Sequence, residues 1–293
     1  MSAPAHKPLL SVCIPAHNEQ DNIGDAIDVI AAALRAASVP FEFVIADDNS
    51  TDGTADVVRA RMAQGVPITL VQRRPPGGFG RAVRSCFDHF HGDIVAVVMA
   101  DLSDDPADIV RCYEVLRDGD YDAVFGSRFK KGSRVVDYPF VKCLANRLGN
   151  KVIQLLFWTR YNDLTNAFKV YRREALQSLQ PLYASHFNLT IELSLGMLNR
   201  GFRIAEVPIA WHGRKKGLAK FNLRTLGRRY LATLMKALAE RRFIHDDLMA
   251  EHNRTMARLH RHEHTEDRVT SNVEATEDPD HGRRGLRRVE PGG

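Results

Sequence analysis

The strict alternation of short apolar runs with helix-like segments is the feature that most constrains the fold of this chain. The apolar runs are LLSVCIP, FEFVIAD, ITLVQR, IVAVVMA and YDAVFGS, and the segments between them cover residues 21–37, 53–62, 81–90 and 107–116. This alternation predicts an α/β fold with right-handed crossovers and a largely parallel sheet. Because ligands bind beyond the carboxyl ends of such strands, the loops that follow the runs are where we expect a site.

The composition is that of an ordinary soluble protein and limits the choice of partners. The 293 residues are 44% hydrophobic and 26% charged, with a formal net charge of +5. That charge is modest for the length, so no nucleic acid is expected as a partner. The four cysteines stand far apart without a CxxC pair, which favours inert thiols in a reducing compartment over a zinc site. There is no apolar core of a signal peptide and no apolar run of about 18 residues, so we expect a protein of the cytosol or of a membrane face.

The run Ile94–Ala100 is uncharged, rich in valine and ends directly on acidic residues. It predicts a central strand, buried on both faces, whose carboxyl end carries Asp101, Asp104 and Asp105 into a ligand crevice. Carboxylates crowded at a strand end favour a compensating cation, and oxygen ligands of this kind suit Mg²⁺ or Mn²⁺. The alternative is that Asp104 and Asp105 merely open a helix at Pro106, where acidic residues favour the helix dipole.

Three other strand-end loops are rich in hydrogen-bonding groups. Residues 15–22 (PAHNEQDN) and 47–54 (DDNSTDGT) each leave a strand and enter a helix, and residues 73–84 (RRPPGGFGRAVR) combine glycines with arginines suited to phosphate. Helix capping and an Asx turn are the simpler interpretation of the first two, although capping does not account for the adjacent carboxylates Asp47 and Asp48. The third lacks the GxxxxGK[ST] spacing of a P-loop, and a mobile glycine loop is its simpler interpretation.

Seven ordered stretches of the chain resemble the family 2 glycosyltransferases of GT-A fold, most closely the group of dolichol-phosphate mannosyltransferases and polyprenyl-phosphate glycosyltransferases. The stretches are PAHNE, DDNSTDGT, GGFGRA, MADLSD, GSR, DLTNAFKVYRRE and RIAEVPIAWHGRKKGLAK, and they cover about Leu9 to Lys220. The resemblance implies a Rossmann-like, mostly parallel sheet of GT-A type with flanking helices over residues 1–220, and it implies a transferase activity.

By this resemblance the first two stretches hold the nucleotide of a sugar donor. The matching positions are Pro15, Asn18, Glu19, Asp47, Asp48 and Asp52, with His17 where the family has a tyrosine before the asparagine. The family's metal motif is DxD followed two places later by a polar residue. Here Met99 replaces the first aspartate, so the resemblance leaves Asp101 as the ligand of Mg²⁺ or Mn²⁺, with Ser103 as a helper and Asp104 as a substitute ligand.

The resemblance also assigns an acceptor phosphate. It would be bound by the arginine of GSR, Arg128, and by a basic residue about fourteen positions later, Lys142, with Asn146 where a serine often lies. Since Arg128 also follows a strand end, we expect it to face the crevice.

The family's closing RxxGxSK motif is present as residues 214–220, with Ala219 in place of the serine. Arg214 and Lys220 would neutralise the leaving diphosphate, and with Asp101 and Arg128 they complete the predicted catalytic set. Glu192 matches a family acidic position, but a glutamate on a helix is usually exposed, so we leave it out of the site.

The function that these expectations favour is an inverting glycosyltransferase. It would move a sugar from a GDP- or UDP-linked donor to a polyprenyl phosphate of dolichyl, undecaprenyl or decaprenyl type. A phosphate monoester with a second pKa near about 6 is mostly a dianion at neutral pH, so it needs orientation more than a strong general base. Two alternatives stay open: a soluble glycosyltransferase acting on a saccharide or small molecule, and a non-catalytic nucleotide-sugar binding protein.

Residues 140–157 and 221–243 carry apolar side chains at helical spacing together with arginines and lysines. The basic amphipathic helix at 221–243 predicts contact with a membrane surface, and packing against its own domain is the equal alternative. Residues 244–293 lose apolar side chains and gain charge, proline and glycine, so we expect a disordered tail after a short helical continuation. The expected location is the cytoplasmic face of a membrane, as a peripheral protein, with a membrane protein as a further candidate partner.

Overall fold

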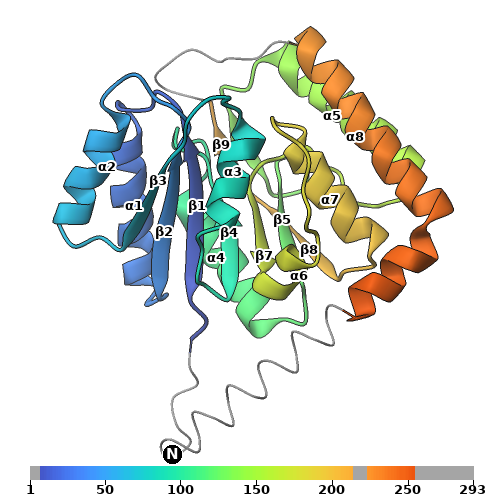
Figure 1. Cartoon of the computed structure of the whole chain (residues 1–293), viewed down its shortest axis with the longest axis horizontal. Coiled ribbons are helices and arrows are strands. Elements are labelled where there is room, and N and C mark those ends of the chain that lie inside the picture. Colours follow the sequence, from blue (N-terminus) through green and yellow to red (C-terminus); the bar gives the residue numbers. More distant parts are fainter. Residues whose placement is uncertain (1–6, 214–222, 255–293) are drawn as a thin grey trace, which may run out of the picture. The chain divides into compact units, whose positions relative to one another are not determined.

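The computed structural model describes residues 7–213 and 223–254. The chain divides into a compact unit, Met1–Met249, and a second unit, Ala250–Gly293, of which residues 250–254 are described and are helical. Every helix and strand labelled in Figure 1 belongs to the first unit.

A seven-stranded sheet forms the centre of this unit, in the spatial order β3-β2-β1-β4-β7-β5-β8. Strand β7 runs antiparallel to its neighbours β4 and β5, and the other neighbouring pairs are parallel. Strands β6 and β9 form a separate parallel pair. The strands are β1 (Leu10–Ala16), β2 (Phe41–Asp47), β3 (Ile68–Gln72), β4 (Ile94–Val97), β5 (Ala123–Ser127), β6 (Arg134–Val136), β7 (Lys169–Arg172), β8 (Ile204–Pro208) and β9 (Ala210–His212).

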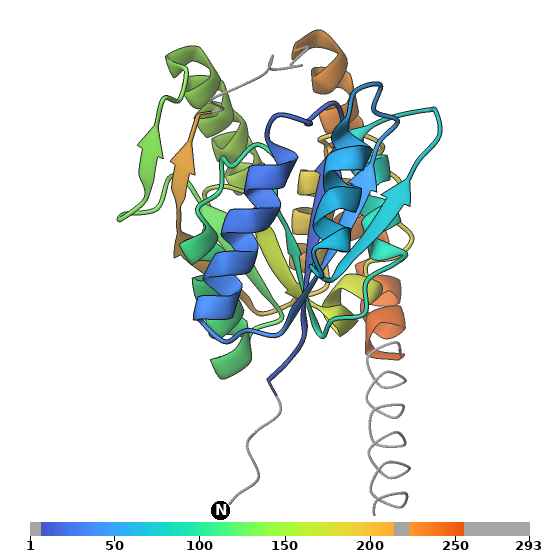
Figure 2. The same ribbon diagram turned by 90° about the vertical axis from the view of Figure 1, so that its left-hand side faces the viewer.

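Helices lie on both faces of the sheet, as Figures 1 and 2 show. They are α1 (Ile23–Ala36), α2 (Thr54–Ala63), α3 (Phe79–Phe87), α4 (Pro106–Asp118), α5 (Phe140–Phe157), α6 (Arg173–Gln177), α7 (Leu189–Asn199) and α8 (Leu223–Phe243). The four helices expected between the first five strands are present. The predicted α/β class, a mostly parallel sheet with flanking helices, is therefore confirmed.

Alternate residues of β1 face two separate hydrophobic cores, which is the reason for its unbroken apolar sequence. Val12 and Ile14 pack with α1 and α4 on one face, whereas Cys13 packs with α3 and α7 on the other. Strand β4 is buried on both faces in the same way, as its sequence predicted, although it ends at Val97 and not at Ala100.

The topology brings one further segment to the edge where the site is expected. Strands β1, β2, β4 and β5 are mutually aligned and end at this edge, whereas the antiparallel β7 begins there. The loop 162–168 that precedes β7 therefore lies beside Arg128, the residue that follows β5. Sequence alternation did not predict this reversed strand.

Helix α8 packs on α7. Ala237 is buried, its carbonyl accepts a hydrogen bond from Asn199 Nδ2 at 2.9 Å, and Asn188 Nδ2 donates to Thr233 Oγ1 at 2.9 Å. Packing on its own unit is thus observed, and membrane contact by its outer face stays a prediction. Residues 245–249 are again helical, in agreement with the short helical continuation expected there. Residues 255–293 and the boundary expected at residue 220 lie outside the described residues.

Candidate active site

The loops after β1 and β2 hold each other through backbone hydrogen bonds. Asn18 Oδ1 accepts from the Thr51 amide at 2.8 Å, and the Asn18 amide donates to Ser50 Oγ at 2.9 Å. The Glu19 amide donates to Thr54 Oγ1 at 2.9 Å. Asn18 and Glu19 therefore fix the shape of this pair of loops, and their contact with a nucleotide stays a prediction. Pro15 lies within β1 and is buried.

The carboxylates after β2 serve the same local structure. Asp47 Oδ1 accepts from the Ser50 amide at 3.1 Å, as in an Asx turn. Asp52 accepts from the Thr54 amide at 3.0 Å and from the Gln20 amide at 3.3 Å. Burial raises the pKa of Asp52, but these hydrogen bonds outweigh burial and leave the pKa below its ordinary value. The capping interpretation thus accounts for Asp52 well.

Asp48 holds the glycine loop and is engaged on both carboxylate oxygens. Oδ1 pairs with Arg73 Nη1, and Oδ2 accepts from the Gly78 amide at 2.6 Å. Gly78 has a φ of +150°, and a Cβ there would lie 2.3 Å from the Ser185 carbonyl oxygen. Phe79 stacks on Phe187 with ring centres 4.4 Å apart. The glycine loop is consequently packed against residues 184–187, and glycine is required there by close backbone contact.

The acidic loop after β4 divides its carboxylates among different tasks. Asp105 caps α4 by accepting from the Ala107 amide at 2.9 Å, as the helix-opening alternative predicted. Asp104 is buried and accepts from the Met99 amide at 3.3 Å. Asp101 is only half-buried, and its Oδ1 accepts from the Ser103 amide at 3.1 Å. Asp104 and Asp105 are thus engaged within the loop itself, and the ligand crevice expected there stays a prediction.

Burial, followed by the negative charge of Asp101, raises the pKa of Asp104 to about 7. The loop that carries both aspartates is joined to β9 by a bridge between Asp104 and Trp211 and by a hydrogen bond of 3.0 Å from the His212 amide to the Ser103 carbonyl. Trp211 thus connects the acidic loop to the cluster of cations described next.

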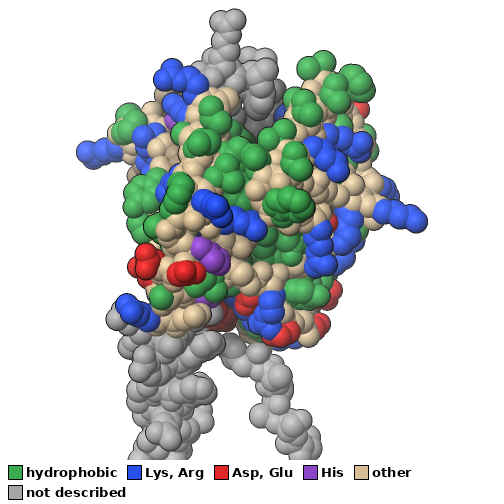
Figure 3. Space-filling view, turned by 90° about the vertical axis from the view of Figure 1, so that its right-hand side faces the viewer, with side chains coloured by type: hydrophobic (Ala, Val, Ile, Leu, Met, Phe, Trp, Pro, Cys, Tyr) green, Lys and Arg blue, Asp and Glu red, His purple; other side chains and the backbone are tan. Residues whose placement is uncertain are grey.

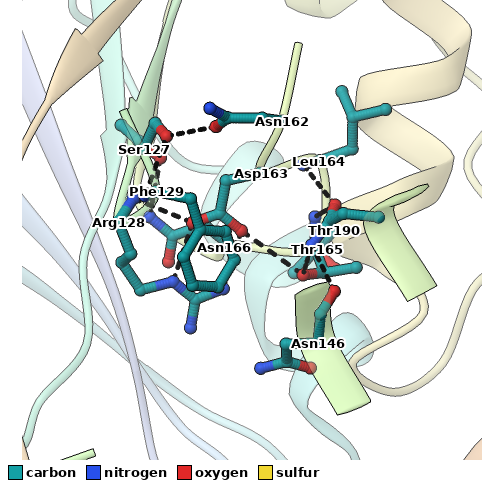
Figure 4. Close-up of polar contacts among 12 residues, drawn as sticks. Ser127, Arg128, Phe129, Asn146, Asn162, Asp163, Leu164, Thr165, Asn166 and Thr190 are labelled. Carbon is teal, nitrogen blue, oxygen red and sulfur yellow. Dashed lines mark hydrogen bonds and ion pairs between the residues drawn. The ribbon is translucent and has the colours of Figure 1, made fainter. Parts of the chain in front are cut away.

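Arg128 is held in a buried ion pair with Asp163. The Asp163 carboxylate accepts from the Arg128 backbone amide at 2.9 Å, from Nε at 2.8 Å and from Nη2 at 2.8 Å (Figure 4). The Asp163 side chain is fully buried. Burial alone would lower the pKa of Arg128, but Asp163 raises it above its ordinary value. This bidentate pair leaves the Nη1 side of the guanidinium to face Tyr138, to whose hydroxyl it donates at 3.2 Å.

The loop that carries Asp163 is fixed from three directions. Asn150 on α5 accepts from the Leu164 amide at 2.8 Å and donates to Thr165 Oγ1 at 2.9 Å. Asn166 Nδ2 donates to the Gly126 carbonyl at 2.8 Å. The buried Lys169 ammonium donates to the carbonyls of residues 164 and 166, and burial lowers its pKa to about 7 despite the attraction of Asp163.

Tyr138 brings the predicted acceptor residues together. Its hydroxyl accepts from Asn146 Nδ2 as well as from Arg128. Lys142 Nζ lies 5.8 Å from the Tyr138 ring centre and 5.9 Å from that of Trp211, and the two rings are 4.7 Å apart. Arg128, Lys142 and Asn146 therefore meet around Tyr138, and their binding of an acceptor phosphate stays a prediction.

The other expected residues fall into two groups. Arg214 and Lys220 lie outside the described residues. Glu192 is buried rather than exposed as expected, and it accepts from the Ala184 amide at 2.7 Å, which fixes the segment behind the glycine loop. Sequence reasoning missed Asp163, Tyr138 and Trp211, although Asp163 and Trp211 stand in two of the stretches that carry the resemblance.

A match to a known family covers residues 11–180, which is more than half of the chain, and the family is described as Glycosyl transferase family 2. This chain belongs to glycosyl transferase family 2. The predicted family and the transferase class are therefore confirmed.

Its relatives in sequence include prenol-phosphate mannosyltransferases. It is 28% identical over 217 residues to the polyprenol monophosphomannose synthase of Mycolicibacterium smegmatis, covering 72% of this chain and 80% of that protein. It is 27% identical over 232 residues to the dolichol-phosphate mannosyltransferase of Pyrococcus furiosus, covering 78% and 64%. It is 29% identical over 217 residues to glycosyltransferase AglD of Haloferax volcanii, covering 73% of this chain but 34% of that protein. The chain thus spans less than two thirds of two of these relatives.

Among solved structures, the fold is similar to glucosyl-3-phosphoglycerate synthase from Mycobacterium tuberculosis. The complex with Mn²⁺, UDP-glucose and phosphoglyceric acid has a TM-score of 0.63 at 22% identity and covers 79% of this chain and 80% of that one. The complex with Mn²⁺, UDP and glucosyl-3-phosphoglycerate has a TM-score of 0.61 at 24% identity, with the same coverage. This likeness supports the GT-A type of fold.

Proposed function

We propose that this chain transfers a sugar from a GDP- or UDP-linked donor to a polyprenyl phosphate, with inversion, at the cytoplasmic face of a membrane. The mannosyltransferases named above support a lipid phosphate as acceptor. We call the loops 17–22, 48–54 and 73–80 the donor side. The acceptor side is the group Arg128, Tyr138, Lys142, Asn146, Asp163 and Trp211.

The observation that carries this proposal is the two-faced character of α5. One row of its residues, Lys142, Asn146 and Asn150, belongs to the acceptor side or supports it. Another row is apolar and exposed, with Leu148 64% and Leu155 72% accessible. An acceptor with an anionic head and an apolar tail would meet matching chemistry on one helix, whereas a sugar or a small phosphate would not need the apolar row.

The exposed apolar residues extend over both α5 and α8. They are Phe140, Val141, Leu144, Leu148, Val152, Leu155, Trp158, Leu231, Met235 and Phe243, and we call them the apolar face. The two helices are joined near their C-terminal ends, where Arg241 of α8 donates to the Phe157 carbonyl of α5 at 2.7 Å. Figure 3 shows these apolar side chains bordered by lysines and arginines. Such a surface is typical of a protein that lies on an anionic membrane. None of the described helices is long and apolar enough to cross a bilayer.

The residues present fit a divalent metal that is held mainly by the donor. Within residues 7–213 and 223–254, no group of three or more His, Cys, Asp or Glu side chains is placed to bind a metal on its own. Mg²⁺ commonly binds through one or two carboxylates plus substrate phosphates, and the half-buried Asp101, with Ser103 beside it, offers such a carboxylate. When bound there, Mg²⁺ or Mn²⁺ would stabilise negative charge on the leaving diphosphate.

The chain's own residues would mainly orient an anionic nucleophile. The acceptor phosphate is already mostly a dianion at neutral pH, so no side chain has to remove a proton from it. Arg128 and Lys142 would offset the repulsion between this phosphate and the donor diphosphate, and the buried Asp163 fixes the orientation of Arg128. Arg214 and Lys220 are proposed to neutralise the leaving group.

Transfer of radiolabelled sugar tests the proposal. A panel of GDP- and UDP-sugars is incubated with polyprenyl phosphate in detergent and Mg²⁺ or Mn²⁺, and organic solvent then extracts the lipid. Label in the lipid phase is the expected result and identifies the sugar. Label only in water-soluble products would favour a soluble glycosyltransferase. Donor binding without any transfer would favour a non-catalytic nucleotide-sugar binding protein.

Asp101→Ala tests the metal assignment within this function. We expect turnover to fall by at least about a hundredfold, because stabilisation of the leaving group is lost, and metal-dependent donor binding to weaken. The half-buried position predicts little change in stability, measured by thermal unfolding. Activity retained by Asp101→Ala would remove Asp101 from the metal site.

A further inference from the structure

Tyr138 stands at the centre of the acceptor side, between elements that are distant in the sequence. It lies between β6 and α5, its ring packs on Trp211 of β9, and its hydroxyl contacts Arg128 after β5 and Asn146 on α5. The side chain is half-buried, so it is neither a core residue nor a freely solvated one.

The hydrogen bonds of the Tyr138 hydroxyl determine what else it can bind. A phenol has one proton to donate and two lone pairs that accept. Arg128 Nη1 donates to this oxygen at 3.2 Å, and Asn146 Nδ2 donates to it as well. With both lone pairs in use, the hydroxyl proton is directed to a further acceptor. Burial raises the pKa of Tyr138, which keeps that proton in place at neutral pH.

The cations around Tyr138 define the kind of acceptor. The Arg128 guanidinium lies 5.5 Å and the Lys142 ammonium 5.8 Å from the ring centre. A ligand that accepts a hydrogen bond from Tyr138 beside these two cations should be an anion with several oxygens. A phosphate monoester meets this description.

We infer that Tyr138 is a specificity-determining residue that donates a hydrogen bond to the acceptor phosphate while it aligns Arg128 and Asn146 toward the same phosphate. The inference rests on the proposed function and deepens it. Trp211 supports the Tyr138 ring and, through its bridge to Asp104, fixes the distance between the acceptor phosphate and the acidic loop.

Tyr138→Phe separates the hydroxyl from the ring. We expect the KM for polyprenyl phosphate to rise about tenfold, because one hydrogen bond to a charged group is lost and two donors lose their partner. The KM for the donor and kcat at saturating acceptor should stay within about twofold of wild type, because the donor side has no contact with this hydroxyl. Tyr138→Leu, which also removes the ring beneath Lys142, should raise the acceptor KM further.

Tyr113→Phe is the matched control. Tyr113 lies on α4, in the hydrophobic core on the other side of the sheet, and its hydroxyl donates to the Pro8 carbonyl at 2.8 Å. The substitution removes this hydroxyl. A purely structural effect of losing a tyrosine hydroxyl would appear in both variants and in their thermal unfolding. Only Tyr138→Phe should change acceptor KM.

A binding measurement tests the same contact without requiring turnover. The chain has two tryptophans, so Trp158→Phe leaves Trp211 as the only fluorescent indole. Titration with citronellyl phosphate, a short isoprenoid phosphate, should change Trp211 fluorescence, and adding Tyr138→Phe should raise the midpoint by about tenfold.

The outcomes separate this inference from the proposed function. If wild type transfers sugar to polyprenyl phosphate and Tyr138→Phe has the wild-type acceptor KM, the inference is wrong and the function stands. If Tyr138→Phe impairs donor and acceptor KM equally, its role is structural and the inference is wrong. If wild type neither labels lipid nor responds to citronellyl phosphate, the proposed function fails and the inference fails with it.

Discussion

On the donor side, two loops that follow adjacent strands hold each other through backbone amides, whereas on the acceptor side Arg128 is held by a buried ion pair between side chains. Asn18 and Asp52 accept from amides across the two loops. Arg128, by contrast, depends on Asp163, and its outer edge contacts Tyr138. The donor side is thus held by amides and side chains of loops that follow neighbouring strands, while the acceptor side is centred on a buried ion pair.

This difference predicts where each side is vulnerable. Removal of a single hydrogen bond between neutral groups, such as that from the Thr51 amide to Asn18, costs about 1 kcal/mol. A buried ion pair is different, because removal of one partner leaves the other charge buried without compensation. We therefore expect substitution of Asp163 to cost more than substitution of Asn18, whose hydrogen bonds join the loops after β1 and β2.

Asp163→Ala has the largest expected effect. It leaves the buried Arg128 guanidinium without its carboxylate, which should lower the free energy of unfolding by about 3–5 kcal/mol, with loss of acceptor use. Denaturant unfolding and acceptor KM measure the two effects. The control is Asp28→Ala, which breaks an exposed pair with Arg61 and should cost about 1 kcal/mol or less. Equal losses of unfolding free energy in the two variants would mean that the Arg128–Asp163 pair contributes no more to stability than an exposed pair.

The sequence predicted most of the donor side because its signals are local. Strand periodicity placed the loops after β1 and β2, and a turn residue such as Asp47 acts within its own loop. The contact between Asp48 and Gly78 was harder to predict, because it depends on the path of a loop 30 residues away.

The acceptor side could be predicted only in part. Arg128 was found from its place after a strand, but its partner Asp163 is 35 residues later and reaches it through the short antiparallel β7, which leaves no clear alternation in the sequence. Tyr138 and Trp211 meet through the packing of residues that flank or belong to β6 and β9, so no spacing rule connects them. Contacts of this kind follow from tertiary structure and not from periodicity.

Asp104 lies in the acidic loop that is bridged to Trp211 of the acceptor side, and it gives a pH-dependent prediction. Its folded-state pKa is raised from 3.8 to about 7, so between these values the folded protein keeps a proton that the unfolded chain has lost. The free energy of unfolding should therefore fall as pH rises from about 4 to 7, by a few kcal/mol at most, since one pKa unit corresponds to about 1.4 kcal/mol. Asp104→Asn, which cannot lose a proton, should flatten this slope. Denaturant unfolding at several pH values in EDTA measures it, and an unchanged slope would contradict the assignment.

Gly78→Ala examines the donor side with the smallest expected effect. The φ of +150° and the Ser185 carbonyl oxygen, 2.3 Å from the position of a Cβ, force the glycine loop to shift. We expect a loss of about 1–3 kcal/mol in stability and a higher donor KM, because the Gly78 amide moves away from Asp48. Gly149→Ala is the matched control: it lies on α5 with no atom within 4 Å of its Cβ position, and it should stabilise the helix by about 0.5–1 kcal/mol. If Gly78→Ala raised acceptor KM and left donor KM unchanged, the division into two separately built sides would be wrong, because the glycine loop contacts no residue of the acceptor side.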